Sequence, residues 1–130
     1  MIYESLHLSV AIARPPAEVY AFAANPENLP RWAAGLTGAV ARVGERWVGD
    51  TPDGPIVIMF APPNPFGVLD HDVTFPSGQT FYNPMRVFAN GAGSEVVFTV
   101  FRREGTGPEA FEADAAAVLT DLRTLKSLLE

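Results

Sequence analysis

Few side chains in this sequence are suited to chemistry, and His71 is the most informative of them. Residues 67–75 alternate between polar and apolar, as in a β-strand, so His71 shares the apolar face with Leu69 and Val73. A histidine in such a place can donate a hydrogen bond to a ligand carbonyl or act as a general base near neutral pH. The other interpretation is a core histidine bonded to the backbone, or one at a cavity rim. The second interpretation is favoured, and His71 is the one candidate for a catalytic residue.

The triplet around His71 has the residue types of a metal site without its geometry. Adjacent strand residues point to opposite faces, so Asp70 and Asp72 face away from His71 and toward solvent. The other histidine, His7, lies on the polar face of its own strand. We therefore expect no metal site and no cofactor. Cysteine and a Gly-x-Ser-x-Gly motif are both absent, so the sequence offers no thiolate chemistry and does not support nucleophilic hydrolysis.

A second group of candidates lies on the following strand. Tyr82 and Arg86 share one face of it, and Met85 is on the other. The pattern does not say which face is concave, because a shift of one residue at the next turn reverses every side chain. An inward Arg86 would pair with a ligand carboxylate, and an outward one with Glu95 at the surface. The outward orientation is slightly favoured because an unpaired buried arginine is costly.

Two aromatic residues, Trp32 and Phe60, could line the mouth of a cavity. Large aromatic side chains are more often simple core residues, so both interpretations stay open. The candidate ligand-binding residues are Trp32, Phe60, His71, Tyr82, Met85 and Arg86.

These candidates need a scaffold, and the longest predicted element is a helix over Pro108–Leu129. Thr106 and Glu109 have the spacing of a capping box, and Pro108 suits the first turn. A helix of this length spans roughly 30 Å, about the width of a small domain. Its apolar residues form one stripe that must cover another surface. The stripe consists of Phe111, Ala115, Val118, Leu119, Leu122, Leu125 and Leu129.

Upstream of this helix, the sequence predicts one strand, two short helices and a series of further strands. Alternation predicts a strand over 3–13, and Pro15-Pro16 and Asn25-Pro26 favour short helices directly after them. Short turns join the later strands, so neighbours should pair antiparallel. These strands are expected at 39–43, 46–50, 55–61, 67–75, 80–89 and 94–103. The expected fold class is α+β, with one large helix against a curved antiparallel sheet.

Two segments in this order of elements are similar to a known family. They are IARPPAEVY at 12–20 and NPENLPRW at 25–32. With them, the chain resembles the START/Bet v 1-like (SRPBCC) superfamily, in particular its polyketide cyclase/dehydrase-like members, over nearly its whole length. The resemblance implies a helix-grip fold, in which a sheet of about six to seven strands wraps around the C-terminal helix. It also implies an apolar cavity between sheet and helix for a small hydrophobic or aromatic ligand.

Composition narrows the function classes further. The 130 residues suit one domain over 1–130, and 48% of them are hydrophobic, which is compatible with a large core or a cavity. A net charge of -6, with no basic cluster beyond Arg102-Arg103, argues against nucleic-acid binding. The longest strongly apolar run, 56–61, is too short to cross a bilayer, and no signal peptide is recognisable. A soluble, cytoplasmic protein is expected.

Two function classes remain. The first is binding of a small hydrophobic ligand, with any catalysis limited to the acid–base chemistry that the polyketide cyclase/dehydrase resemblance implies; whether the protein is an enzyme stays open. The second is a non-enzymatic interaction module that forms a homodimer. It rests on the predicted strand 94–103, where Val97 and Phe101 are opposite Val96 and Phe98, so both faces are apolar and one needs a cover.

Overall fold

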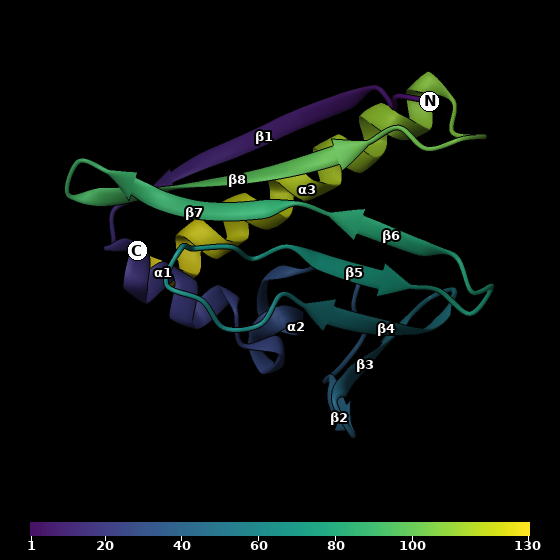
Figure 1. Cartoon of the computed structure of the whole chain (residues 1–130), viewed down its shortest axis with the longest axis horizontal. Helices are drawn as coiled ribbons and strands as arrows, with labels where there is room; N and C mark the ends of the chain where they lie inside the picture. Colours follow the sequence, from purple (N-terminus) through teal and green to yellow (C-terminus); the bar gives the residue numbers. More distant parts are fainter.

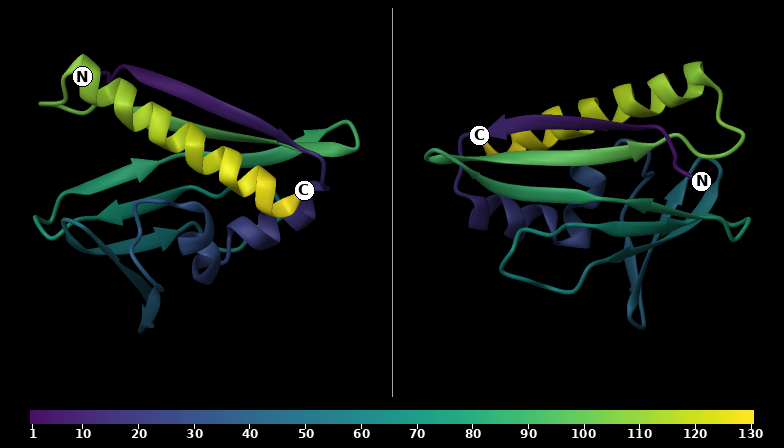
Figure 2. Two further views of the ribbon diagram at one scale, coloured as in Figure 1. Left: turned by 180° about the vertical axis from the view of Figure 1, so that it is seen from behind. Right: turned by 45° about the horizontal axis from the view of Figure 1, so that its top comes forward.

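Helix α3 (Pro108–Leu129) lies on the concave side of a curved antiparallel sheet (Figures 1 and 2). The computed structural model describes the whole chain, residues 1–130. The helix has the predicted bounds, and its most deeply buried side chains belong to the predicted apolar stripe. They are Phe111, Ala115, Leu122 and Leu125. The predicted helix-grip architecture is therefore confirmed.

Eight strands make up the sheet, and all neighbouring pairs are antiparallel. Their order is β1-β8-β7 in one part and β2-β3-β4-β5-β6 in the other. The count exceeds the predicted six to seven because the predicted strand 80–89 is interrupted at Pro84. The bounds are β1 (Ser5–Ile12), β2 (Ala41–Val43), β3 (Arg46–Thr51), β4 (Gly54–Phe60), β5 (His71–Thr74), β6 (Thr80–Asn83), β7 (Met85–Asn90) and β8 (Gly93–Phe101).

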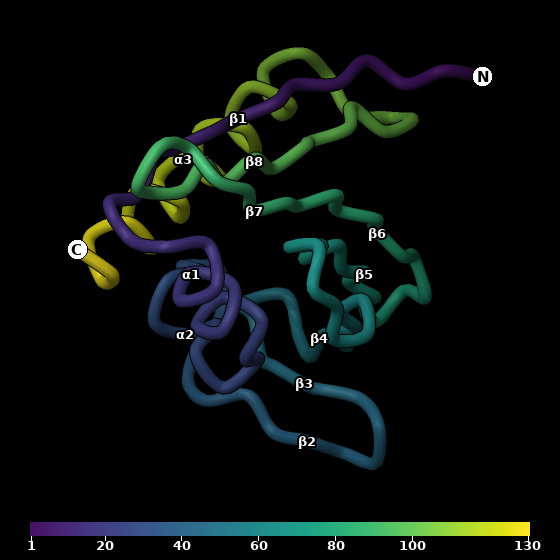
Figure 3. The backbone as a smooth tube through the Cα atoms, turned by 60° about the vertical axis from the view of Figure 1, so that its left-hand side comes forward, coloured from purple at the N-terminus to yellow at the C-terminus, as the bar shows by residue number.

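Two short helices follow β1, as predicted. They are α1 (Pro16–Ala23) and α2 (Leu29–Trp32), and a single 3₁₀ turn (Pro26–Asn28) precedes the second. Asn25 caps this turn, because its side-chain oxygen accepts a hydrogen bond from the Glu27 amide at 3.1 Å. Figures 1 and 3 show both helices between the β1-β8-β7 part of the sheet and the β2-β3 hairpin. The helices therefore close the open side of the curved sheet.

The predicted capping box at the start of α3 was wrong. Gly107 is the N-cap residue, and no side chain caps the first turn. The carbonyl of Thr106 instead accepts a hydrogen bond from Arg102 Nε at 2.9 Å. Pro108 explains the difference, since its fixed φ and missing N–H suit the first helical position and make the residue before it the cap.

The other end of α3 is tied to the corner between β1 and α1. Arg14 Nε donates to the carbonyl of Leu129 at 2.7 Å, and Lys126 Nζ donates to the carbonyl of Ala11 at 2.6 Å. Both cations lie at the C-terminus of the helix, where the helix dipole is negative and favours positive charge. The C-terminal turn of α3 is thereby fixed to the N-terminal part of the chain.

The two parts of the sheet meet at Pro84, where β6 runs into β7. Proline has no N–H to donate, and the next amide, that of Met85, donates to Asp70 Oδ1 at 2.9 Å. Arg86 donates to both oxygens of Asp70, Nε to Oδ1 at 3.0 Å and Nη2 to Oδ2 at 2.8 Å. The Tyr82 hydroxyl donates to Oδ2 at 2.9 Å. The bonds from Arg86, helped by those from Met85 and Tyr82, lower the pKa of the Asp70 carboxyl although burial opposes them.

Two expectations change at this junction. Arg86 does point outward, but its partner is Asp70 and not Glu95, which accepts a hydrogen bond from Asn90 Nδ2 at 2.8 Å. Asp70 was expected to face solvent, yet its side chain is only 17% exposed. Both differences from expectation follow from the interruption at Pro84. The interruption brings Asp70 beside Arg86, and it leaves the Met85 amide free to bind the Asp70 carboxylate.

The predicted strand 67–75 is divided in two. Its second half is β5, which pairs with β6. Its first part pairs with β7, since the Leu69 amide donates to the Met85 carbonyl at 2.8 Å and the Val87 amide to the Gly67 carbonyl at 2.9 Å. Gly67 has φ +71°, and a Cβ there would lie 2.0 Å from the Val87 carbonyl oxygen. Only glycine therefore fits at the start of this pairing.

Replacing Asp70 by asparagine should destabilise the fold, because the amide nitrogen faces the donors of Arg86 and Tyr82. We expect the free energy of unfolding at pH 7 to fall by about 1–3 kcal/mol, measured by urea denaturation. The exposed neighbour Asp72, replaced in the same way, is the control and should change little.

The contribution of the Asp70 carboxylate to the stability of the fold should depend on pH. The pKa of Asp70 is lowered from 3.8, so the stabilisation is present above that pH and is lost as the pH falls through the lower pKa of the folded state. Equal losses in the Asp70→Asn and Asp72→Asn proteins would contradict a specific role for Asp70.

Candidate functional site

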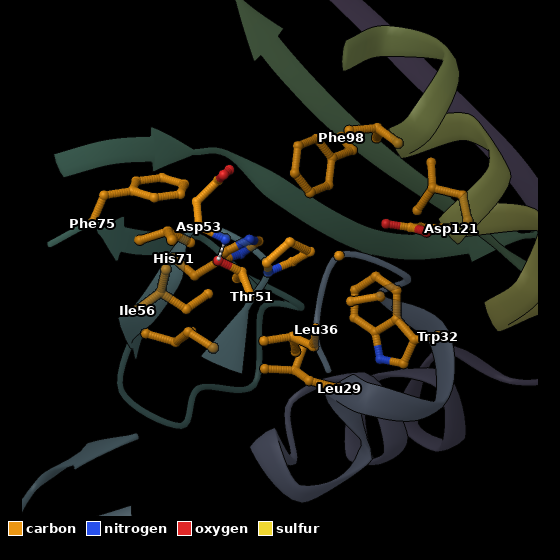
Figure 4. Close-up of a pocket in the computed structure, with 17 residues that line it drawn as sticks. Leu29, Trp32, Leu36, Thr51, Asp53, Ile56, His71, Phe75, Phe98 and Asp121 are labelled. Atoms are coloured by element: carbon orange, nitrogen blue, oxygen red, sulfur yellow. Dashed lines mark hydrogen bonds between the residues drawn. The ribbon is translucent and has the colours of Figure 1, made fainter. Parts of the chain in front are cut away.

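A cavity of about 370 Å³ lies between α3, α2 and the concave face of β4 and β5 (Figure 4). This volume is in the range of pockets that hold small organic ligands. Its open rim is formed by exposed residues of two loops, Gly35 on one side and Pro52 and Asp53 on the other. Its walls are mostly apolar. They include Leu29, Trp32, Leu36, Ile56, Phe75 and Phe98.

His71 contributes a polar atom to this apolar wall. Its side chain belongs to a residue that is only 8% exposed, and it packs between Phe60 and Phe98, with ring centroids 5.0 and 5.6 Å away. Nδ1 lies 3.0 Å from the carbonyl oxygen of Leu69. Because a carbonyl oxygen can only accept, Nδ1 carries the hydrogen. Nε2 then has a free lone pair, and it has no hydrogen-bond partner within the protein.

The electrostatic state of His71 follows from its burial. Burial lowers the pKa of the imidazole below 6.5, although the bond to Leu69 and the charges of Asp70 and Asp72 act in the opposite direction. The ring is therefore neutral near pH 7. The interpretation of His71 as a histidine bonded to the backbone at the cavity wall fits this geometry. Ligand contact stays a prediction, and in this form Nε2 could accept a hydrogen bond from a ligand but could not donate one to a ligand carbonyl.

Asp121 is the functional candidate that the sequence analysis missed. It lies on α3 between Val118 and Leu122, both of which also line the cavity. Its Oδ1 accepts a hydrogen bond from the Ala34 amide at 3.2 Å, and it forms no ion pair. Burial raises the pKa of this carboxyl, and the bond from Ala34 opposes part of the change. Its spacing, three residues after Val118 and four before Leu125, places it on the face of the apolar stripe, and this was the signal that could have identified it.

Thr51 and Asp53 are the remaining polar side chains in the lining. The Thr51 hydroxyl donates to the Gly54 carbonyl at 2.8 Å and accepts a hydrogen bond from the Asp53 amide at 3.2 Å. The one hydrogen of this hydroxyl is therefore used within the β3-β4 turn. Asp53 is exposed at the rim.

Among the predicted ligand-binding residues, Trp32 and His71 line the cavity. Trp32 is 4% exposed, and its Nε1–H is buried without an acceptor. Phe60 contacts the His71 ring but borders a different, smaller groove on the surface. The α2 helix and β5 therefore bring two of the predicted residues together.

The other three predicted residues lie elsewhere. Met85 is fully buried in the core and does not border the cavity. Tyr82 is 46% exposed, and the Arg86 side chain is 49% exposed, both on the outer face of the sheet. Alternation along β7 explains this placement, because Met85 points to the core and its neighbour Arg86 must point away.

The structure contains no group of three or more His, Cys, Asp or Glu side chains that could hold a metal ion. None of its helices has both the length and the hydropathy that crossing a bilayer requires.

A family model described as "polyketide cyclase / dehydrase and lipid transport" matches residues 4–127. The chain belongs to this family. The START/Bet v 1-like resemblance seen in the sequence is thereby confirmed. No curated protein sequence matches the chain.

Solved structures of low sequence identity share the fold of this family member. XoxI from Bacillus cereus is 15% identical with a TM-score of 0.73, covering 99% of this chain and 96% of its own. Ara h 8.0201 is 13% identical with a TM-score of 0.70, covering 98% of both chains. The Aha1 dimer from Colwellia psychrerythraea is 18% identical with a TM-score of 0.73, covering 100% and 97%. At these identities the similarity concerns the fold, and function must be inferred from the site.

The neutral Nδ1–H form of His71 can be tested by NMR. In a His7→Gln protein the one remaining histidine signal belongs to His71, and long-range ¹H–¹⁵N correlation should show the Nδ1–H tautomer. The titration midpoint should lie below 6.5, because burial lowers the pKa. A midpoint at or above 6.5, or a proton on Nε2, would contradict the geometry described here.

The lowered pKa of His71 also determines how the stability of the protein changes with pH. The unfolded chain binds a proton at this histidine more readily than the folded protein does, so stability should decrease as the pH falls below 6.5. A His71→Phe substitution should remove this component of the pH dependence.

Proposed function

We propose that this protein binds a small, largely apolar ligand in the cavity between α3 and the sheet. The observation that supports this most directly is the cavity itself, an apolar space of about 370 Å³ with an open rim. An empty space of this size inside a core would ordinarily be filled by side chains, since protein interiors are close-packed. The family description, which includes polyketide cyclases, dehydrases and lipid transport, is compatible with such a ligand.

Binding is a better-supported role than catalysis. His71 Nε2 is the one ring nitrogen available to accept a proton from a ligand, and doing so would create a buried imidazolium. Burial disfavours that charge and lowers the pKa of His71, which makes it a weak base. Asp121 on the opposite wall is a further acid–base group, with a raised pKa. We therefore place orientation of a ligand ahead of acid–base chemistry at this site.

The proposal can be tested with N-phenyl-1-naphthylamine, a neutral dye whose fluorescence increases in apolar surroundings. The protein should bind it with one site per chain. Val118 lines the cavity from α3, so a Val118→Phe substitution should fill part of the space and weaken binding by at least about tenfold.

The matched control for this experiment is Ala117→Phe, which places the same side chain on the exposed face of α3. It should leave dye binding unchanged. Equal affinity of the wild-type and Val118→Phe proteins for the dye, with the fold intact by circular dichroism, would overturn the proposal.

Homodimerisation is a second proposed function, and it rests on the outer face of the β1-β8-β7 part of the sheet. Phe88 is 50% exposed on this face, where it pairs with Glu95. Val97, two residues further along β8, is half-buried on the same face and pairs with Arg86. One similar structure is described as a dimer. Polar side chains such as Arg86, Glu95 and Thr99 surround these apolar ones. Association with a second copy would cover the apolar side chains and leave the polar ones around them.

Light scattering coupled to size-exclusion chromatography tests the dimer. We expect twice the chain mass at micromolar concentration, and a single chain mass after Phe88→Glu, because that carboxylate would be buried in the interface. Exposed Met59, on a different strand, provides the control as Met59→Glu. A strictly monomeric wild-type protein would rule the dimer out.

A further inference from the structure

The polar atoms that the cavity offers to a ligand are hydrogen-bond acceptors. His71 presents the lone pair of Nε2, because its Nδ1–H is bonded to the Leu69 carbonyl. Asp121 presents the carboxylate oxygen that does not bond to Ala34. The hydrogen of the Thr51 hydroxyl is directed to a backbone carbonyl in its own turn and is not available.

The other side-chain donor in the lining, the indole N–H of Trp32, is out of reach. Its Nε1 is buried so completely that it lacks both an acceptor and access to water. A ligand in the cavity therefore meets acceptors on two opposite walls, from β5 and from α3 (Figure 4).

The charges around the cavity have one sign. No lysine or arginine lines it, whereas Asp53 is at its rim and Asp121 is in its wall. The Asp121 carboxylate is half-buried and has no cationic partner within the protein. A ligand carboxylate or phosphate would bring a second negative charge next to it in a poorly solvated place, which is unfavourable.

A ligand that brings a donor would have the opposite effect. A hydroxyl or an ammonium group can satisfy the free oxygen of Asp121, and hydrogen bonds to charged groups are stronger than neutral ones. A second donor on the same ligand would meet His71 Nε2, which has no partner within the protein and belongs to a residue that lines the cavity. The apolar walls then fit the remainder of the molecule.

On the basis of the proposed function, we propose that Asp121 selects the ligand by its polar group. The site takes an aromatic-sized apolar molecule that carries a hydrogen-bond donor, a hydroxyl or an ammonium, and rejects the corresponding carboxylic acid. Asp121 is in this view the specificity-determining residue of the cavity.

Three probes that share one ring system test this selection. They are 2-naphthylmethanol, 2-naphthylmethylamine and 2-naphthoic acid, each used to displace N-phenyl-1-naphthylamine from the wild-type protein at pH 7. The alcohol and the amine should each bind at least about tenfold more tightly than the acid, because one charge-assisted hydrogen bond is gained and one repulsion avoided.

Asp121→Asn supplies the decisive comparison. The amide keeps an oxygen for the Ala34 N–H and replaces the free carboxylate oxygen by a donor. We expect the acid to bind about tenfold more tightly than it does to the wild type, and the amine about tenfold more weakly. If the amine loses much affinity and the alcohol little, the preferred polar group is an ammonium. If both lose affinity to a similar extent, the site recognises the hydrogen-bond donor that the two probes share.

The control is Asp114→Asn, which removes one exposed carboxylate from the same helix. This substitution should leave the relative affinities for acid, alcohol and amine as in the wild type. If it alters them as Asp121→Asn does, the selection results from net charge, and the proposal is overturned. Equal affinity of the wild type for acid, alcohol and amine would also overturn it. If the dye itself does not bind, the proposed function fails, and the selection by Asp121 fails with it.

Discussion

The bond between Asp70 and the amide of Met85 is the interaction on which the shape of this molecule depends. A sheet that curves around a helix needs a place where its hydrogen-bond pattern changes, and Pro84 provides that place because it has no N–H. The amide beyond it would be left without an acceptor if Asp70 did not reach it. Arg86 and Tyr82 complete the arrangement by bonding to the same carboxylate. The concave surface that receives α3, and with it the cavity, depends on this junction together with the pairing of residues 67–69 with β7.

The sequence was informative about elements whose signal is local. The apolar stripe gave α3 its bounds, the prolines and Asn25 marked the short helices, and the resemblance in 12–32 identified the architecture. The orientation of Arg86 was less accessible, because it depends on which residue approaches it across the Pro84 interruption. Alternation along one strand carries no information about that partner.

Asp121 was missed for a different reason. Helix periodicity identifies the apolar residues of a buried stripe, and it does not distinguish a charged residue at the edge of that stripe from the polar surface. The spacing of Asp121, three residues from Val118 and four from Leu125, puts it at the edge of the buried face. A half-buried carboxylate without a cation and a buried histidine with a free nitrogen both reduce stability, and such groups concentrate at sites that do something other than hold the fold together.

The attachment of α3 at its C-terminal turn has a consequence for how a guest molecule would move in and out. Arg14 binds the carbonyl of Leu129 and Lys126 binds the carbonyl of Ala11, so the C-terminal turn of α3 is held next to β1. Passage is left to the rim, where Gly35 and Pro52 are exposed and belong to loops. Loops of this kind open with little free energy compared with the whole fold. For the ligand proposed above, the residence time would then depend on these two loops, separately from its affinity for the walls and from the global stability of the protein.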